Sequence, residues 1–319
     1  MVDLFQVILL LANLLFGVFD VPSTDIGYEE TSSNIYQTAV TLGATEFVKL
    51  VDRSTWVKDQ LQHGSNYTVF IPDNEAFETM SKAAKEAIKF DTVAEWVLKY
   101  HMGIGHLTAR DYKNDLRLPS SFKPTGYGLQ SLRINIYEAF KGGHRKVYSV
   151  SGATIFRPDY ECSNGIAHII KKVIFPLPTG NNIAEFFEKD PRFSLLNMFI
   201  KKANLTATLT TDPNHALTVF APNDDAIQKL TDEQKKKLVN TTYLNETLKT
   251  HVVGDAFYAA SFYDFKSFTA LTGETLILEQ GRGGTTVQDK LIESFDVTLT
   301  NGVVHGMSEM FFPGYSVQT

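Results

Sequence analysis

The sequence predicts an α+β protein built from two tandem copies of one domain. Three observations lead to this prediction. The 319 residues suit two domains of ordinary size. Four blocks of sequence recur in the same order in both halves. Each half also combines a β-prone segment, helical periodicity and a second β-rich segment, which together indicate an α+β domain.

The repeat is defined by two constant spacings. Two pairs of blocks are 150 residues apart: TVFIPDNEAF (68–77) with TVFAPNDDAI (218–227), and LKYHM (98–102) with LKTHV (248–252). The next two pairs are 137 residues apart: NGIAHII (164–170) with NGVVHGM (301–307), and KVIFP (172–176) with EMFFP (309–313). The first copy therefore contains 13 additional residues between its second and third blocks. We expect them within the segment from Arg110 to Tyr148, because insertions normally fall in surface loops.

The first block predicts a strand followed by a helix. Thr68, Val69 and Phe70 favour a strand, and Pro72 ends it because proline has no backbone N–H for a ladder. Asp73 or Asn74 is then placed to cap a helix. The acidic strip 73–75 and its counterpart 223–225 could also suggest a cation contact, but helix capping explains these residues without a ligand.

The second block predicts a longer helix whose apolar stripe faces the core. Thr92 and Glu95 have the spacing of a capping box. The stripe follows the i, i+3, i+4, i+7 pattern of a buried helix face: Val93, Trp96, Val97 and Tyr100.

The closing blocks predict a hairpin in each copy. Asn164-Gly165 and Asn301-Gly302 suit tight turns between strands. A short linker at 177–180 separates the copies, so the predicted domains are 33–177 and 180–314.

The N-terminal residues predict secretion. An apolar run from Leu4 to Phe19 is short for a membrane span and suits the core of a signal peptide, placed at about 1–22. An uncleaved anchor is the alternative, since the start carries Asp3 and no Lys or Arg. No other segment could span a membrane, so we expect an extracellular protein without a span in the mature chain.

Four Asn-x-Ser/Thr motifs agree with secretion and predict glycosylation: Asn66, Asn204, Asn240 and Asn245. All four lie outside the shared blocks, where glycans could remain on the surface. The single cysteine, Cys162, is either buried or available to a partner; burial is the more common state of a free cysteine.

The repeated blocks resemble the fasciclin domain. The resemblance rests on the TVF-x-P block, the histidine after a helix, and the closing NG-x-x-H with its downstream proline, all found twice. It implies a β-wedge or sandwich with a cluster of helices, as in extracellular-matrix and cell-adhesion proteins. It also implies adhesion, often through integrins, so the expected partner is a cell-surface receptor or a matrix protein or polysaccharide.

Tyr100 and His101 match the tyrosine–histidine motif that the family associates with integrin binding, and the second copy has Thr250 in place of the tyrosine. The alternative is packing, since Tyr100 continues an apolar helical stripe. His168 and His305 follow the hairpin turns and favour a core role in the same way.

Catalysis is not indicated. The sequence contains no G-x-S-x-G elbow, no H-E-x-x-H and no phosphate loop. No cofactor is implied, and a zinc site from paired histidines would need further ligands. A net charge of −6 argues against nucleic acid as a partner.

Two rival function classes remain beside adhesion. A secreted carrier would hold an apolar small ligand in a pocket that draws on the 23 Phe and 13 Tyr residues. A hydrolase or metalloprotein would use the paired histidines.

Overall fold

The computed structural model describes residues 33–124, 128–139, 145–177, 182–210, 216–262 and 267–314. The predicted signal peptide at 1–22 and most of the predicted linker lie outside these residues. In the described part of the chain, no helix combines the length and apolar character that crossing a bilayer requires.

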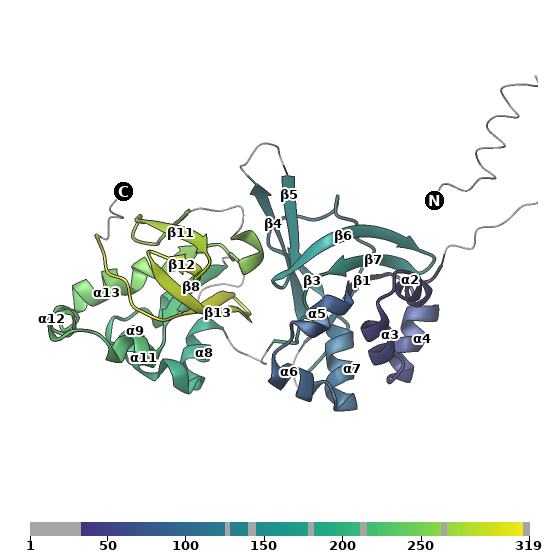
Figure 1. Cartoon of the computed structure of the whole chain (residues 1–319), viewed down its shortest axis with the longest axis horizontal. Coiled ribbons are helices and arrows are strands. Elements are labelled where there is room, and N and C mark those ends of the chain that lie inside the picture. Colours follow the sequence, from purple (N-terminus) through teal and green to yellow (C-terminus); the bar gives the residue numbers. More distant parts are fainter. Residues whose placement is uncertain are drawn as a thin grey trace, which may run out of the picture. The chain divides into compact units, whose positions relative to one another are not determined.

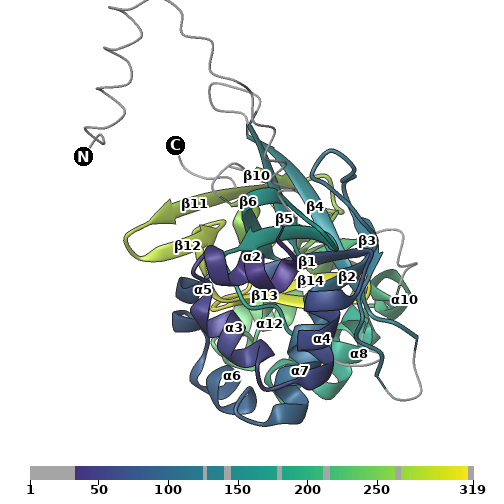
Figure 2. The same ribbon diagram turned by 90° about the vertical axis from the view of Figure 1, so that its right-hand side faces the viewer.

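The first domain combines a cluster of helices with one sheet (Figures 1 and 2). Its helices are α2 (Ile35–Thr41), α3 (Thr45–Val51), α4 (Thr55–His63), α5 (Asn74–Glu78), α6 (Lys82–Ala87) and α7 (Asp91–Tyr100). Its strands are β1 (Tyr67–Pro72), β2 (Met102–Ile104), β3 (Leu116–Pro119), β4 (Ser131–Ala139), β5 (Arg145–Val150), β6 (Ala153–Cys162) and β7 (Gly165–Ile170).

The second domain repeats this order. Its helical segments are α8 (Ile183–Lys189), η1 (Pro191–Phe193), α9 (Ser194–Lys202), α10 (Thr206–Leu209), α11 (Asp224–Gln228), α12 (Asp232–Lys237), α13 (Thr241–Thr250) and η2 (Ala259–Ser261). Its strands are β8 (Leu217–Pro222), β9 (Val252–Gly254), β10 (Ser267–Thr269), β11 (Thr275–Gly281), β12 (Gly284–Val287), β13 (Lys290–Leu299) and β14 (Gly302–Met307).

Each sheet has seven strands and is nearly closed. The orders are β2-β1-β7-β6-β5-β4-β3 and β10-β11-β12-β13-β14-β8-β9. Single bridges, Gly103 with Ser120 and Val253 with Ala270, bring the two ends of each sheet together. β1 and β7 run parallel, as do β8 and β14, while the neighbouring pairs are antiparallel. The predicted α+β fold with two tandem domains is therefore confirmed.

The strand and cap predicted from the first block are present. β1 ends at Pro72, and the Asp73 side chain accepts a hydrogen bond from the Ala76 amide at the start of α5. The counterpart cap is Asn223, which accepts from the Ala226 amide. Local sequence was sufficient here because both partners of each cap lie within three residues.

For the longer helix, the predicted capping box is wrong and the predicted inward stripe is only partly correct. α7 begins at Asp91 without a side-chain cap, because the Glu95 carboxylate instead accepts hydrogen bonds from Ser54 and Lys99. Of the four residues in the predicted inward stripe, two are fully buried and one is exposed. Val97 and Tyr100 are buried, whereas Trp96 is 47 % exposed.

The Asn-Gly hairpins are present, and their residues also join the sheet to the helices. Asn164 accepts from the Ile35 amide and donates to the Leu61 carbonyl, and Asn301 bonds Ile183 and Leu209 in the same way. The asparagine of each hairpin thus fixes the first helix of its domain against the sheet.

Several side-chain contacts join the two domains directly. The Arg133 guanidinium is 2 % exposed, donates to the Thr300 carbonyl and pairs with Asp115 at 3.0 Å. Tyr137 donates to the Ala256 carbonyl across the same boundary. A buried arginine therefore ties β4 of the first domain to the β13–β14 turn of the second.

Candidate functional site

The structure places Tyr100 in the core of the first domain. Its side chain is fully buried at the end of α7 among apolar residues of the sheet. The hydroxyl lies 3.3 Å from Ser151 Oγ and 3.4 Å from the Ser131 carbonyl oxygen. Burial raises the pKa of the Tyr100 phenol. The ring therefore acts on the surface only through the position of α7.

His101 is also buried and is held as a neutral ring. Its Nδ1 donates to the Val97 carbonyl at 2.7 Å, and its Nε2 accepts from the Ile174 amide at 3.2 Å. Burial lowers the pKa of His101 to about 4. The imidazole thus connects the end of α7 to the segment that follows β7.

His251 has the same role in the second domain. It bonds the Thr247 carbonyl and the Phe311 amide, and burial lowers its pKa to about 4. His168 and His305 form the second matched pair. Each accepts at Nδ1 from an aspartate amide, Asp159 or Asp296, nine residues before it.

The paired histidines have no nitrogen left for a metal. Nε2 of His168 bonds Tyr112 and the Leu107 carbonyl, and Nε2 of His305 bonds the Phe257 carbonyl. Among the described residues, no group of three or more His, Cys, Asp or Glu side chains could hold a metal ion. The ring nitrogens of these histidines stabilise the fold through hydrogen bonds, and the described residues do not form a catalytic centre around them.

The acidic strip serves as a helix start. Asp73 caps α5, and Asn74 joins it to the α2–α3 connection through the Gly43 carbonyl and the Glu46 amide. Lys171 pairs with Asp73 and Glu75 at 2.7 and 2.9 Å. These contacts account for the acidic strip 73–75 without a bound metal ion.

The four predicted glycosylation sites differ in accessibility. Asn66, Asn204 and Asn240 are exposed, whereas Asn245 is half-buried and its Nδ2 donates to the Ala203 carbonyl at 2.9 Å. Since the sugar attaches to Nδ2, a glycan suits Asn245 least well. Glycosylation stays a prediction at all four positions.

Cys162 is a buried free thiol in the structure. Its Sγ lies 3.3 Å from the Thr38 hydroxyl, and burial raises the pKa of the thiol. This position favours packing over reactivity.

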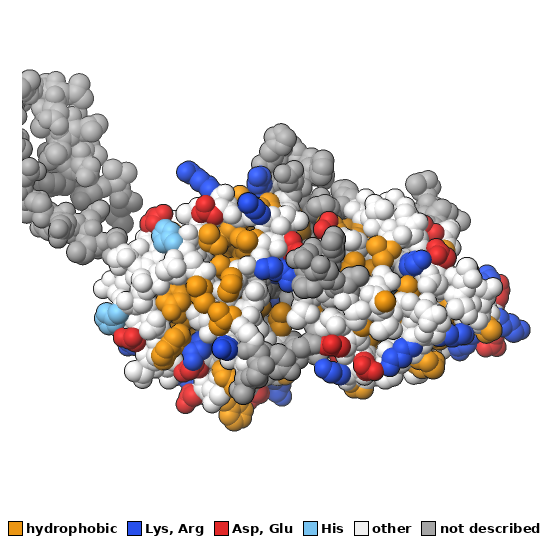
Figure 3. All heavy atoms as spheres, turned by 180° about the vertical axis from the view of Figure 1, so that it is seen from behind, with side chains coloured by type: hydrophobic (Ala, Val, Ile, Leu, Met, Phe, Trp, Pro, Cys, Tyr) orange, Lys and Arg blue, Asp and Glu red, His pale blue; other side chains and the backbone are white. Residues whose placement is uncertain are grey.

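A groove lies on the first domain, and the sequence analysis named neither its place nor the residues that line it, although the carrier alternative requires an apolar pocket of this kind. Its volume is about 470 Å³, and its apolar lining is Val93, Trp96, Val97, Phe122, Phe175 and Leu177. The rings of Trp96 and Phe122 lie 6.0 Å apart between centroids. Hydrophobic side chains also gather on the face of the first domain seen in Figure 3. The apolar helical stripe was the available signal, but periodicity alone assigns Trp96 to the core.

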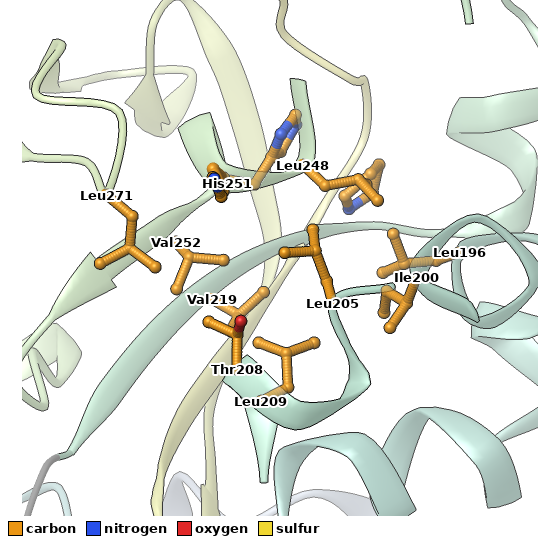
Figure 4. A pocket seen from close by; sticks show the side chains of 12 residues that line it. Leu196, Ile200, Leu205, Thr208, Leu209, Val219, Leu248, His251, Val252 and Leu271 are labelled. Atoms are coloured by element: carbon orange, nitrogen blue, oxygen red, sulfur yellow. The ribbon is translucent and has the colours of Figure 1, made fainter. Parts of the chain in front are cut away.

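The second domain contains a much smaller space. Apolar side chains of α9, α10, α13 and β8 close around about 20 Å³ (Figure 4). This volume corresponds to about one water molecule, so it is a packing gap in the core.

Comparison with known proteins agrees with the fold. The family model described as Fasciclin domain matches residues 42–176 and 191–313. The chain is 26 % identical over 285 residues to transforming growth factor-beta-induced protein ig-h3 of Sus scrofa, covering 88 % of this chain and 40 % of that protein. It is 24 % identical over 289 residues to periostin of Homo sapiens, covering 89 % of this chain and 33 % of periostin.

A solved FAS1 domain pair from the insect cell adhesion molecule Fasciclin I is also similar. The likeness has a TM-score of 0.41 at 18 % identity and covers 85 % of this chain and 98 % of that one. The chain spans at most two fifths of the two named relatives. Because the family model matches most of the sequence in two segments, the chain belongs to the fasciclin domain family.

Proposed function

We propose that this protein is an extracellular adhesion or matrix glycoprotein that binds a cell-surface receptor, integrin-like in kind, or a matrix component. The observation that carries the proposal is the tandem fasciclin pair, matched over 88 % of the chain to transforming growth factor-beta-induced protein ig-h3. The apolar N-terminal run and the exposed Asn-x-Ser/Thr motifs support an extracellular location.

The geometry favours binding over catalysis. The histidines that could have formed an active site bond backbone groups through their ring nitrogens, and their pKa values are lowered by burial. A receptor would therefore meet exposed surfaces positioned by this core. The prediction that Tyr100 and His101 contribute to binding remains part of the proposal, with both residues acting through the position of α7.

Cell attachment to surfaces coated with the purified protein tests the proposal. We expect several cell types to attach to the folded protein, and soluble protein added in solution to compete. A coat of the same protein unfolded before adsorption is the matched control. Attachment that is equal on folded and unfolded coats, or absent from both, would contradict the proposal.

A further inference from the structure

The groove on the first domain differs from the corresponding part of the second domain, although both domains have the same fold. Residues of α7 and α13 correspond at a spacing of 150, so Trp96 has Glu246 as its counterpart. The bridges Gly103–Ser120 and Val253–Ala270 extend the same spacing, which pairs Phe122 with Thr272. The fold therefore does not require aromatic side chains at these two positions.

A further aromatic residue of the first domain is exposed outside the residues that line the groove. Phe90, which precedes α7, is 69 % exposed. Its counterpart at the same spacing is Asn240, which caps α13 and belongs to an Asn-x-Thr motif. The first domain thus presents aromatic rings where the second presents polar residues and a predicted glycan site. Contiguous apolar surface marks binding sites, and Trp96 and Phe122 provide it where their rings meet at the groove.

The walls of the groove are built for an apolar occupant. Val97 and Phe122 line the groove with 1 and 7 % exposure, and the Phe122 ring lies 6.0 Å from that of the more exposed Trp96. Leu177, another lining residue, has both of its backbone groups bonded to the Gln130 side chain, at 2.8 and 2.9 Å. The backbone groups of Leu177 are therefore already satisfied, which leaves its apolar side chain to contact a ligand.

The size of the groove indicates a small molecule. Small-molecule sites are clefts of about 300–1,000 Å³ with apolar walls and few polar groups. The volume of about 470 Å³ falls in this range. Two prolines, Pro124 and Pro176, complete the lining and add rigid apolar surface.

Lys123 determines the charge of the occupant. It is the charged side chain of the lining and is exposed. No carboxylate among the described residues pairs with its ammonium group. A lysine beside an apolar surface favours a ligand with an apolar body and an anionic end, because the ammonium can remain hydrated until it meets that end.

We propose that this groove, formed by α7, the segment after β3 and the segment after β7, binds a small apolar anion such as a medium-chain carboxylate. The aromatic rings hold the apolar chain, and Lys123 pairs with the carboxylate at the rim. This site is separate from the adhesion activity proposed above and does not depend on it.

The two tryptophans allow a direct test. Trp56→Phe leaves Trp96, in the groove wall, as the single tryptophan. Dodecanoate, kept below the concentration at which it self-associates, is titrated into this variant while tryptophan emission is recorded. We expect a saturable change in emission. Dodecyltrimethylammonium, with the same chain and the opposite charge, should bind more weakly.

Three further variants, made in the Trp56→Phe background, locate the site. Phe122→Thr introduces the residue of the second domain and should weaken dodecanoate binding by about tenfold or more, since an aromatic contact is lost. Lys123→Gln should weaken it severalfold and remove the preference for the anion. Val40→Thr, at a residue 52 % exposed outside the groove, is the matched control and should leave binding unchanged.

Circular dichroism checks that each variant is folded. If Phe122→Thr fails to fold, Trp96→Glu at an exposed position replaces it, with binding read by titration calorimetry.

Absence of saturable binding, or equal binding by the Phe122→Thr and Val40→Thr variants, would overturn the proposal. Equal affinity for the two amphiphiles would overturn the assignment of an anion. A third result would also overturn the proposal: the Trp56→Phe protein binds no dodecanoate, and the Phe122→Thr variant loses cell attachment. That result would assign the groove to a protein partner.

Discussion

The Tyr100 ring fills space between α7 and the sheet of the first domain, and its hydroxyl makes long contacts of 3.3 and 3.4 Å. Packing therefore contributes more to its role than hydrogen bonding. His101, the next residue, makes shorter bonds of 2.7 and 3.2 Å to backbone groups. These two neighbours stabilise the same helix end by different means.

Replacing Tyr100 should separate the two contributions. We expect Tyr100→Phe to lower the free energy of unfolding by about 1 kcal/mol, because only the hydroxyl contacts are lost. Tyr100→Ala should lower it by about 4 kcal/mol, because a cavity remains in the core. Chemical denaturation measures both values. Equal losses would mean that the hydroxyl, and not the ring, determines the stability at this position.

The buried histidines predict acid sensitivity. Burial lowers the pKa of His101, His168 and His251 from 6.5 to about 4 in the folded protein. Between these values the unfolded chain binds protons that the folded chain does not, so stability is complete above pH 6.5 and falls as the pH approaches 4. The loss is about 1.4 kcal/mol per pH unit for each such histidine.

Thermal melts at several pH values measure this effect. We expect the Tm to fall steadily from pH 6.5 to pH 4.5. A His251→Asn variant, which keeps a polar side chain but cannot titrate there, should show a shallower decline than the wild type. A wild-type Tm that is constant over this range would contradict the neutral, buried state of these rings.

The hairpin between β13 and β14 is the element that holds the second sheet to its helices. Gly302 lies beside the parallel strand β8, and a Cβ there would collide with the Leu217 carbonyl oxygen. Gly165 has the same close approach to Tyr67 in the first domain. The glycine of each Asn-Gly pair is thus required by the neighbouring strand.

Substitution of this glycine should disrupt the sheet. We expect Gly302→Ala to lower the free energy of unfolding by about 3 kcal/mol, because backbone must move to admit the methyl group. Gly254→Ala is the matched control, since nothing lies within 4 Å of the added Cβ. Urea titration compares the two. A loss for Gly302→Ala no larger than that for Gly254→Ala would contradict the strand spacing.

Elements governed by local contacts could be predicted from the sequence, and those governed by distant contacts could not. β1 and its cap at Asp73 follow from residues within one short block. The start of α7 was mispredicted because Glu95 bonds Ser54, which is 41 residues away. The exposure of Trp96 depends on Phe122 and on the segment after β7, and helical periodicity contains no information about either. The position of the groove therefore could not be predicted from the sequence, whereas the repeat and the family could.

In the whole molecule, the two domains meet through a buried charge. Arg133 is 2 % exposed and reaches both Asp115 and the Thr300 carbonyl. A nearby pair, Lys172 with Asp296 at 3.1 Å, also crosses the boundary; the lysine is 45 % exposed, while the Asp296 side chain is 5 % exposed and also accepts a hydrogen bond from the Ala259 amide. Buried charges are costly to leave unpaired, whereas exposed pairs contribute little.

This difference predicts how the domains unfold. Arg133→Met should destabilise the protein by about 3 kcal/mol and separate the unfolding of the two domains, because it removes the most deeply buried partner of Asp115 and of the Thr300 carbonyl and leaves both to Arg117, which is 30 % exposed. Lys172→Met should have a smaller effect, because Asp296 keeps the hydrogen bond from the Ala259 amide. Differential scanning calorimetry distinguishes one transition from two. A single unchanged transition in the Arg133→Met variant would contradict a structural role for this contact.

The folded domain pair is proposed to bind its partners through exposed surfaces that a buried core supports. The decisive test is cell attachment to coats of wild type, Tyr100→Phe, and the double variant Tyr100→Ala, His101→Ala, with the folded fraction of each protein measured by circular dichroism. We expect attachment to follow the folded fraction, so that Tyr100→Phe behaves as the wild type and the double variant loses attachment as it unfolds. Loss of attachment by fully folded Tyr100→Phe, or full attachment to the unfolded double variant, would contradict this proposal.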